Sequence, residues 1–167
     1  TNSRRNFIKK SVVIPSIIIL PRHVLGGKNY TSPSDKLDIA SVGVGGRGRR
    51  NTIAFQNENI VSLCDVDSVH SSSTIKKFPK AKFYNDFRIM LEKQKNIDAV
   101  IISTPDHTHA VIASMAIKMG KHIFCEKPLT HTVYEARYIR ELAKKYKVQT
   151  QMGNQGHSSD EIRSLKE

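Results

Sequence analysis

The residues of this chain best suited to chemistry are Glu126 and Lys127, which end the apolar run HIFC and stand directly before Pro128. A lysine ammonium held at a strand end can donate a hydrogen bond to an oxygen that gains negative charge during a reaction. Pro128 cannot donate to a strand ladder, and it restricts Lys127 to extended backbone angles, which helps to fix where the side chain points. Lys127 is therefore the candidate catalytic residue, and a surface lysine before a turn is the alternative.

Three glycines in SVGVGGRGRRN, namely Gly43, Gly45 and Gly48, have the spacing of a phosphate-binding turn. One glycine allows a tight turn, one lets a phosphate approach the backbone, and one lets a helix pack closely on a strand. The free amides of this loop, which also contains Gly46 and Arg47, would face an anion together with the positive end of the next helix. The loop predicts a site for the pyrophosphate of a dinucleotide, and a glycine turn without a ligand is the alternative.

An acid follows the second apolar run, in IVSLCDVD. Asp65 lies about 20 residues beyond the first glycine, where a carboxylate can accept hydrogen bonds from the adenosine ribose hydroxyls. Its charge repels a 2′-phosphate, so NAD is preferred, although Arg47 and Arg49 keep NADP open because a guanidinium can bind that phosphate. A methyltransferase shares the strand, glycine and acid pattern but usually spaces its glycines differently.

These residues need a scaffold that brings strand ends together, and the pattern from Asp35 onward supplies one. Short β-rich runs alternate with helical patterns, which is typical of an α/β fold with a doubly wound parallel sheet. We expect a Rossmann fold of about six strands in the order 3-2-1-4-5-6. The expected strands are Leu37–Val44, Ile60–Cys64, Lys82–Tyr84, Ala99–Ser103, His122–Cys125 and Val148–Met152. Gly120 predicts a helix stop, and Thr132 with Glu135 predicts a capping box.

The stretches GVGGRG, CDVD, STPDHTH and CEKP together resemble the N-terminal half of the Gfo/Idh/MocA oxidoreductases, from Leu37 to about His157. The resemblance implies a sheet that binds a nicotinamide dinucleotide and a second domain that binds a sugar, cyclitol or related hydroxy compound. It places Arg47 and Gly48 at the pyrophosphate and Asp65 at the adenosine ribose. The remaining implied contacts are Thr104, Pro105, Asp106 and His109 on the nicotinamide side, Glu126 and Lys127 by the nicotinamide ribose and reacting carbon, and Asn154 near the carboxamide.

The resemblance implies an NAD(P)-dependent oxidoreductase, with a glycosidase of the same fold that retains NAD as the alternative enzyme. A non-enzymatic sensing or structural module is the third possibility, against which Asp65 and Lys127 argue. Gln155 stands where many relatives have arginine, so a substrate role of that arginine does not carry over. We expect residues 155–167 to begin a second domain that is missing here, so that this chain alone would bind dinucleotide with little turnover. That domain would also form a homo-oligomer.

The first 34 residues are expected to be an export signal and linker rather than part of the folded domain. SRRNFIK resembles a twin-arginine signal, which implies use of that export machinery and a periplasmic destination. The apolar stretch Val12–Leu20 is too short to anchor the chain across a membrane. A basic disordered arm is the alternative. The expected organisation is therefore signal and linker (1–34), dinucleotide-binding domain (35–154) and start of the second domain (155–167).

The charge and the cysteines exclude other classes. The net charge is +12, but residues 1–34 hold six of the 27 basic groups and none of the 15 acids, so the excess in the rest is smaller and spread out. We therefore expect no nucleic-acid partner. Cys64 and Cys125 fall on strands that are not neighbours in the expected order, so no disulfide is expected. Among the seven histidines, His107 and His109 form an H-x-H pair, but His122 and Cys125 add no recognisable ligand spacing, and we expect no metal site.

Overall fold

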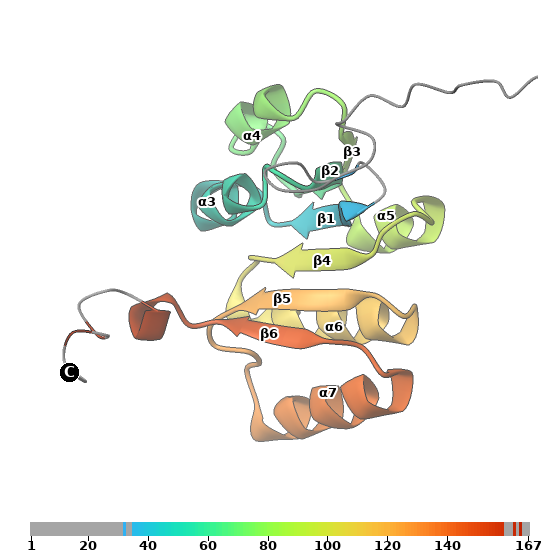
Figure 1. The fold of residues 1–167 in the computed structure, drawn as a ribbon, viewed down its shortest axis with the longest axis vertical. Coiled ribbons are helices and arrows are strands. Elements are labelled where there is room, and N and C mark those ends of the chain that lie inside the picture. Colours follow the sequence, from blue (N-terminus) through green and yellow to red (C-terminus); the bar gives the residue numbers. More distant parts are fainter. Residues whose placement is uncertain (1–31, 33–34, 159–161, 163, 165–167) are drawn as a thin grey trace, which may run out of the picture. The chain divides into compact units, whose positions relative to one another are not determined.

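The structure, a computed structural model, describes residues 32, 35–158, 162 and 164. Nearly all of residues 1–34, expected to hold the export signal and linker, and most of residues 159–167, expected to belong to the second domain, lie outside these residues. From Asp38 onward strands and helices alternate along the chain, as the sequence predicts (Figure 1). The elements are β1 (Asp38–Val42), α3 (Gly46–Ala54), β2 (Asn59–Cys64), α4 (Ser72–Lys77), β3 (Lys82–Tyr84), α5 (Phe87–Lys93), β4 (Ala99–Ile102), α6 (Asp106–Lys118), β5 (His122–Glu126), α7 (Val133–Tyr146), β6 (Thr150–Gly153) and the 3₁₀ turn η2 (Gln155–Ser158).

The six strands form one parallel sheet in the order β3-β2-β1-β4-β5-β6, which confirms the predicted Rossmann order. Because all strands run the same way, their carboxyl ends meet at one edge of the sheet, where the arrowheads lie in Figure 1. The strand order reverses between β1 and β4, and ligands of such sheets bind outside the strand ends at this switch point. The fold thus brings the glycine loop after β1 and the loop after β4 side by side.

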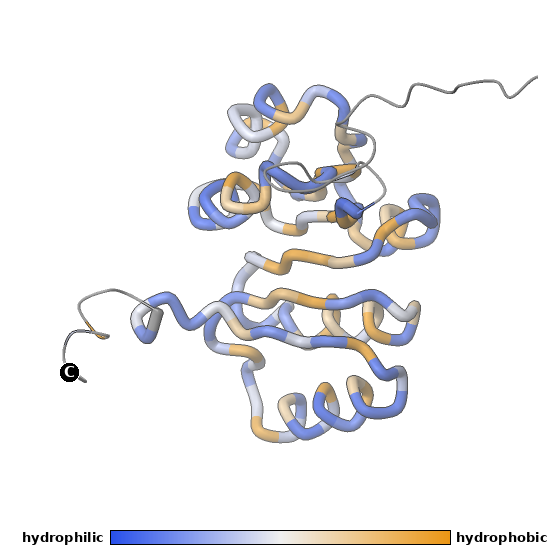
Figure 2. The backbone as a smooth tube through the Cα atoms, in the orientation of Figure 1, coloured by the Kyte–Doolittle hydropathy of each residue, from blue (hydrophilic) through white to orange (hydrophobic). Residues whose placement is uncertain are grey.

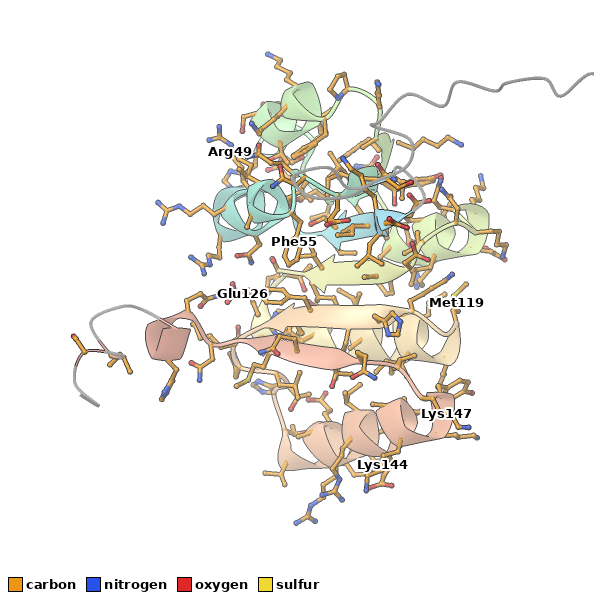
Figure 3. All side chains as sticks on the ribbon, viewed as in Figure 1. Arg49, Phe55, Met119, Glu126, Lys144 and Lys147 are labelled. Carbon is orange, nitrogen blue, oxygen red and sulfur yellow. The ribbon has the colours of Figure 1, made fainter. Side chains whose placement is uncertain are left out.

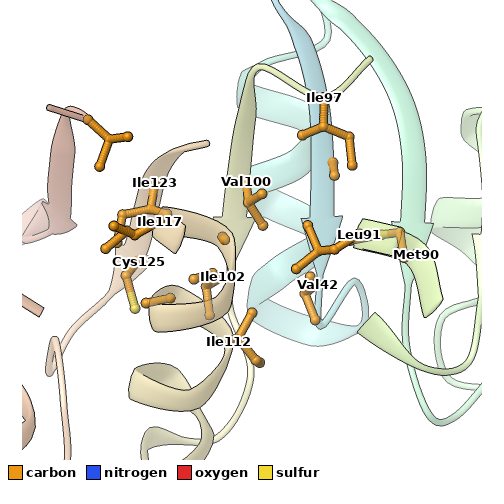
Figure 4. Packing of buried hydrophobic residues seen from close by; sticks show 14 of the residues in the cluster. Val42, Met90, Leu91, Ile97, Val100, Ile102, Ile112, Ile117, Ile123 and Cys125 are labelled. Atoms are coloured by element: carbon orange, nitrogen blue, oxygen red, sulfur yellow. The ribbon is translucent and has the colours of Figure 1, made fainter. Parts of the chain in front are cut away.

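Side chains on the two faces of the sheet enter two separate apolar clusters. Val100 and Ile102 of β4 belong to the cluster drawn in Figure 4, which also takes in side chains of α5, α6 and α7. Ile101 between them faces the opposite cluster, which Phe55 and Phe78 pack against. Burial of each such aliphatic side chain stabilises the fold by about 1.5–3 kcal/mol. Figure 2 shows β4 as a nearly continuous hydrophobic segment, as expected of a central strand covered on both faces.

Helix ends confirm two sequence predictions. Gly120 has a φ of 74° just beyond α6, and the Thr132 side chain accepts from the Glu135 amide in a complete capping box. The first and last strands are shorter than predicted for local reasons. Gly43 turns the chain with a φ of 76° after Val42. Val148 still donates its amide to Ala143 O and so completes the end of α7 instead of opening β6.

Candidate functional site

The glycine loop joins β1 to α3, and its glycines are required by close approach. A Cβ on Gly48 would lie 1.6 Å from Gly43 O, and a Cβ on Gly43 would lie 2.7 Å from Ser103 O. These contacts let α3 start directly against β1 and β4. Gly45, the residue before α3, has no side chain to cap the helix. The first amides of α3, from Gly46, Arg47 and Gly48, therefore have no acceptor within the helix and can bind an anion.

Asp65 follows β2 and ties that strand end to the glycine loop. Its Oδ2 accepts from the amides of Val44 at 2.8 Å and Gly45 at 3.1 Å, and its Oδ1 accepts from the Asp67 amide at 3.0 Å. A carboxylate offers about four acceptor sites, so Oδ1 retains capacity for a ribose hydroxyl. Asp65 is half-buried and lies at the predicted edge of the sheet. Its carboxylate thus shapes the loop and keeps one side available to the ribose.

A cationic hollow lies beside this loop, and it has no acid in its lining. Its lining residues are Gly46, Arg47, Arg49, Arg50, His70 and Ser73. The His70 ring lies over Gly45, since a Cβ on that glycine would come within 2.1 Å of His70 Cδ2. Arg49 projects from α3 on this side (Figure 3). These positive groups favour a phosphate, so the hollow leaves NADP open beside NAD.

Glu126 ends β5 (labelled in Figure 3) and binds three side chains from two distant segments, α3 and η2. Its Oε1 accepts from Arg47 Nε at 3.0 Å, Asn51 Nδ2 at 2.8 Å and Gln155 Nε2 at 2.6 Å. Burial raises the pKa of Glu126, but the hydrogen bonds from Asn51 and Arg47 outweigh it and bring the pKa below its ordinary value. The side chain is 7% exposed. Glu126 is therefore a buried carboxylate that joins the glycine loop, β5 and the segment after β6.

Lys127, the next residue, is exposed. Its amide donates to Glu126 Oε2 at 3.3 Å, so its backbone is held by the carboxylate before it. Within the described part of the chain its ammonium has no hydrogen-bond or ion-pair partner. The structure thus presents a free cation at the carboxyl edge of the sheet, next to a carboxylate that is already paired.

The loop after β4 and the start of α6 carry four of the predicted site residues. Thr104 is half-buried and its hydroxyl accepts from Thr108 Oγ1 at 2.7 Å, while Pro105 and Asp106 are exposed at the start of α6. His109 differs, because it is fully buried and both its ring nitrogens lie against backbone oxygens. In this conformation the ring is turned away from the surface, and the expected place of His109 on the nicotinamide side stays a prediction.

The segment after β6 reaches the same edge. Asn154 is exposed, as a contact to the carboxamide requires, and its backbone N–H donates to Met152 O at 3.0 Å. The sequence points to Gln155 only as a replacement for arginine, yet its side-chain amide donates to Glu126 Oε1. Asn51 was missed altogether. It follows Arg47 by one helical turn, so helical spacing from the glycine loop would have pointed to it.

Within the described residues, the cysteines and histidines form no further reactive or metal site. Cys64 and Cys125 are free and buried, and burial raises the pKa of each thiol to about 12. No group of histidine, cysteine and acidic side chains with the geometry of a metal site occurs among residues 35–158. In the same part of the chain, no helix has the length and apolar character needed to cross a membrane.

Known proteins share this arrangement. The GFO_IDH_MocA family, described as an oxidoreductase family with an NAD-binding Rossmann fold, matches residues 37–154. Inositol 2-dehydrogenase from Salmonella paratyphi B is 29% identical over 113 residues, which are 66% of this chain and 33% of that protein. The crystal structure of myo-inositol 2-dehydrogenase from Lactobacillus plantarum superposes with a TM-score of 0.72 at 26% identity, over 78% of this chain and 40% of that one.

A structure of scyllo-inositol dehydrogenase from Lactobacillus casei with bound NAD(H) and scyllo-inositol has the same fold, with a TM-score of 0.70 at 24% identity over 78% of this chain and 40% of that one. The chain thus spans about a third of the length of the inositol dehydrogenase that it matches. The match covers the sheet, the glycine loop, Asp65 and the end of β5. On this evidence the chain belongs to the Gfo/Idh/MocA oxidoreductase family and carries its NAD-binding Rossmann domain.

Proposed function

We propose that the protein transfers hydride between NAD and a hydroxyl-bearing carbon of a sugar, cyclitol or related compound. One observation carries this proposal: the free ammonium of Lys127 stands beside the paired Glu126, at the edge where the glycine loop and the loop after β4 meet. The inositol dehydrogenases among the relatives support a cyclitol or sugar as the substrate class.

Each part of the site has a separate task in this proposal. The first amides of α3 bind the pyrophosphate, and Asp65 accepts from the adenosine ribose. The Arg47 guanidinium is paired with Glu126. Because this pairing offsets the charge of Glu126, the carboxylate places little free negative charge near the reacting oxygen. Lys127 donates a hydrogen bond to the substrate oxygen and stabilises the negative charge that develops there as the hydroxyl proton passes to water or to a base of the proposed substrate domain. The nicotinamide, when bound, accepts or donates the hydride.

Replacement of Lys127 by methionine tests this assignment. Calorimetry on the 167-residue chain should show NAD affinity within about threefold of the unchanged chain, because the ammonium makes no contact that shapes the fold. In the protein as its cells make it, turnover with inositols and sugars should fall by about 10²-fold or more. Lys144→Met, at an exposed position on α7, is the matched control and should change neither quantity. Equal turnover of the Lys127 variant would assign the proton-linked role to another residue.

The finer points are proposals of the same kind. A glycosidase that retains NAD would cleave a glycoside with no net change in the absorbance of reduced cofactor, whereas a dehydrogenase changes that absorbance in step with product. The cationic hollow at Arg49 and Arg50 supports NADP as a second cofactor, and competition between NAD and NADP in the calorimeter measures the preference.

Export to the periplasm through the twin-arginine route is proposed from SRRNFIK, which lies outside the described residues. Substitution of Arg4 and Arg5 by lysine should keep the protein in the cytoplasmic fraction, and unchanged export would reject the route. We also propose that a substrate domain completes the pocket and supports a homo-oligomer. On this view the 167-residue chain alone binds NAD but turns over little substrate, which an assay of the isolated chain checks directly.

A further inference from the structure

His109 lies in the first turns of α6 with no exposed surface, and both of its ring nitrogens face backbone carbonyl oxygens. Nδ1 is 2.7 Å from Pro128 O, and Nε2 is 2.8 Å from Thr104 O. Thr104 belongs to the loop after β4 and Pro128 to the loop after β5, so one imidazole connects two loops at the carboxyl edge. Both distances are those of good hydrogen bonds.

The chemistry of the two partners decides what the ring must be. A carbonyl oxygen only accepts, and a neutral imidazole has a single N–H to donate, so it satisfies one of these oxygens and sets a lone pair against the other. The imidazolium has two N–H groups and satisfies both. A buried acceptor left without its donor costs about 1–3 kcal/mol. Burial opposes the charge of an imidazolium, so the doubly protonated ring forms only where its two hydrogen bonds offset that loss of hydration. No carboxylate in the described residues forms an ion pair with His109; the charged groups near these loops in the chain are Asp106, Glu126 and Lys127.

We propose that His109 is a positioning residue that acts through the two loops that it joins, both of which are expected to line the nicotinamide: as an imidazolium it fixes the Pro128 carbonyl to the loop after β4. The backbone on the other side of Lys127 is held by Glu126, whose Oε2 accepts from the Lys127 amide at 3.3 Å. Cys125 Sγ donates to Leu129 O at 3.7 Å and adds a third tie. Lys127 is thus an exposed residue of a segment whose backbone is anchored before and after it. His109 supports the site without touching a ligand.

Nitrogen-15 NMR of the unmodified chain at neutral pH tests the protonation state directly. The His109 signals are assigned by their loss in the His109→Gln spectrum. Two directly bonded hydrogens, one on each ring nitrogen and both slow to exchange with water, are the expected result. A single bonded hydrogen would show a neutral ring that serves one carbonyl, and it would overturn the proposal.

Two matched variants test the positioning role. In His109→Asn the amide nitrogen falls near the place of Nδ1 and can still bind Pro128 O, whereas in His109→Gln it falls near Nε2 and can still bind Thr104 O. Each variant loses one of two buried hydrogen bonds, and we expect each to weaken NAD binding by about three- to tenfold in calorimetry. Leu142→Ala, in the core under α7, is the control: it should lower stability and leave NAD affinity unchanged.

The calorimetric arm rests on the proposed function, and the two can fail separately. If the unmodified chain gives no heat with NAD, the proposed function fails while the NMR result still decides the state of His109. If the unmodified chain binds NAD and both variants bind it equally well, His109 has only a structural role and the positioning proposal is wrong.

Discussion

Gly48→Ala is the substitution that most directly tests the geometry of the nucleotide loop. The new Cβ would lie 1.6 Å from Gly43 O, whereas real Cβ contacts essentially never fall below 3.0 Å. The turn and α3 must therefore separate by roughly 1.4 Å at this point. The obstacle is backbone, which cannot rotate aside as a side chain does. The substitution thus acts on the turn whose amides are expected to bind the pyrophosphate.

The expected magnitude follows from two opposing effects. Overpacking of this kind costs about 1–3 kcal/mol, and a backbone carbonyl as the obstacle places it near the upper end. Alanine is a better helix former than glycine, and this raises the free energy of unfolding by about 1 kcal/mol. We therefore expect the free energy of unfolding to fall by about 2 kcal/mol, a change of roughly thirtyfold in the folding equilibrium. NAD affinity should fall at least tenfold as well, because the loop amides move.

Urea unfolding followed by circular dichroism, with calorimetry for NAD, measures both effects. Gly45→Ala is the control for stability. The three atoms nearest to its Cβ belong to the exposed ring of His70, which can turn away, and its φ of −82° suits any residue. Its free energy of unfolding should change by no more than about 0.5 kcal/mol. If Gly48→Ala were as stable as Gly45→Ala, α3 would not pack on Gly43 as described, and the argument for the loop would be wrong.

Three further outcomes are expected. Glu126→Gln should reduce the loss of stability on acidification, because the pKa of Glu126 is lowered in the folded state. The carboxylate therefore stabilises the fold above the ordinary glutamate pKa, and this stabilisation is lost as the pH falls through the lower folded value. Urea midpoints between about pH 6 and about pH 3 measure the difference. Thr132→Ala removes the capping box of α7 and should lower the free energy of unfolding by about 1 kcal/mol, with a smaller effect for Thr132→Ser; equal stability of all three proteins would show that the cap contributes nothing. Cys64 and Cys125, with pKa values of about 12, should resist iodoacetamide at neutral pH in the folded chain and react in urea, and rapid labelling without urea would contradict their burial.

The order of the strands and the general location of the site could be predicted from sequence because both depend on local patterns. Alternation of β-rich runs with helical runs, together with the right-handed crossover rule, leaves few ways to arrange six parallel strands. Gly43 and Gly48 indicate positions where two backbone segments come close together, because glycine has no side chain. Asp65 directly follows its strand in the sequence. Such features need no knowledge of distant residues.

Side-chain partners could not be predicted in this way. Arg47 and Glu126 are 79 residues apart in the chain, and they meet because β1 and β5 end at the same edge of one sheet. His109 has the sequence position of a ligand contact, but the direction of its side chain depends on how α6 packs, and the packing turns it inward to two carbonyl oxygens. The sequence by itself therefore determined the elements, the glycine turn and the family resemblance. Tertiary structure alone decided which side chains are paired and which, like Lys127, remain free, because pairing depends on where distant strand ends converge.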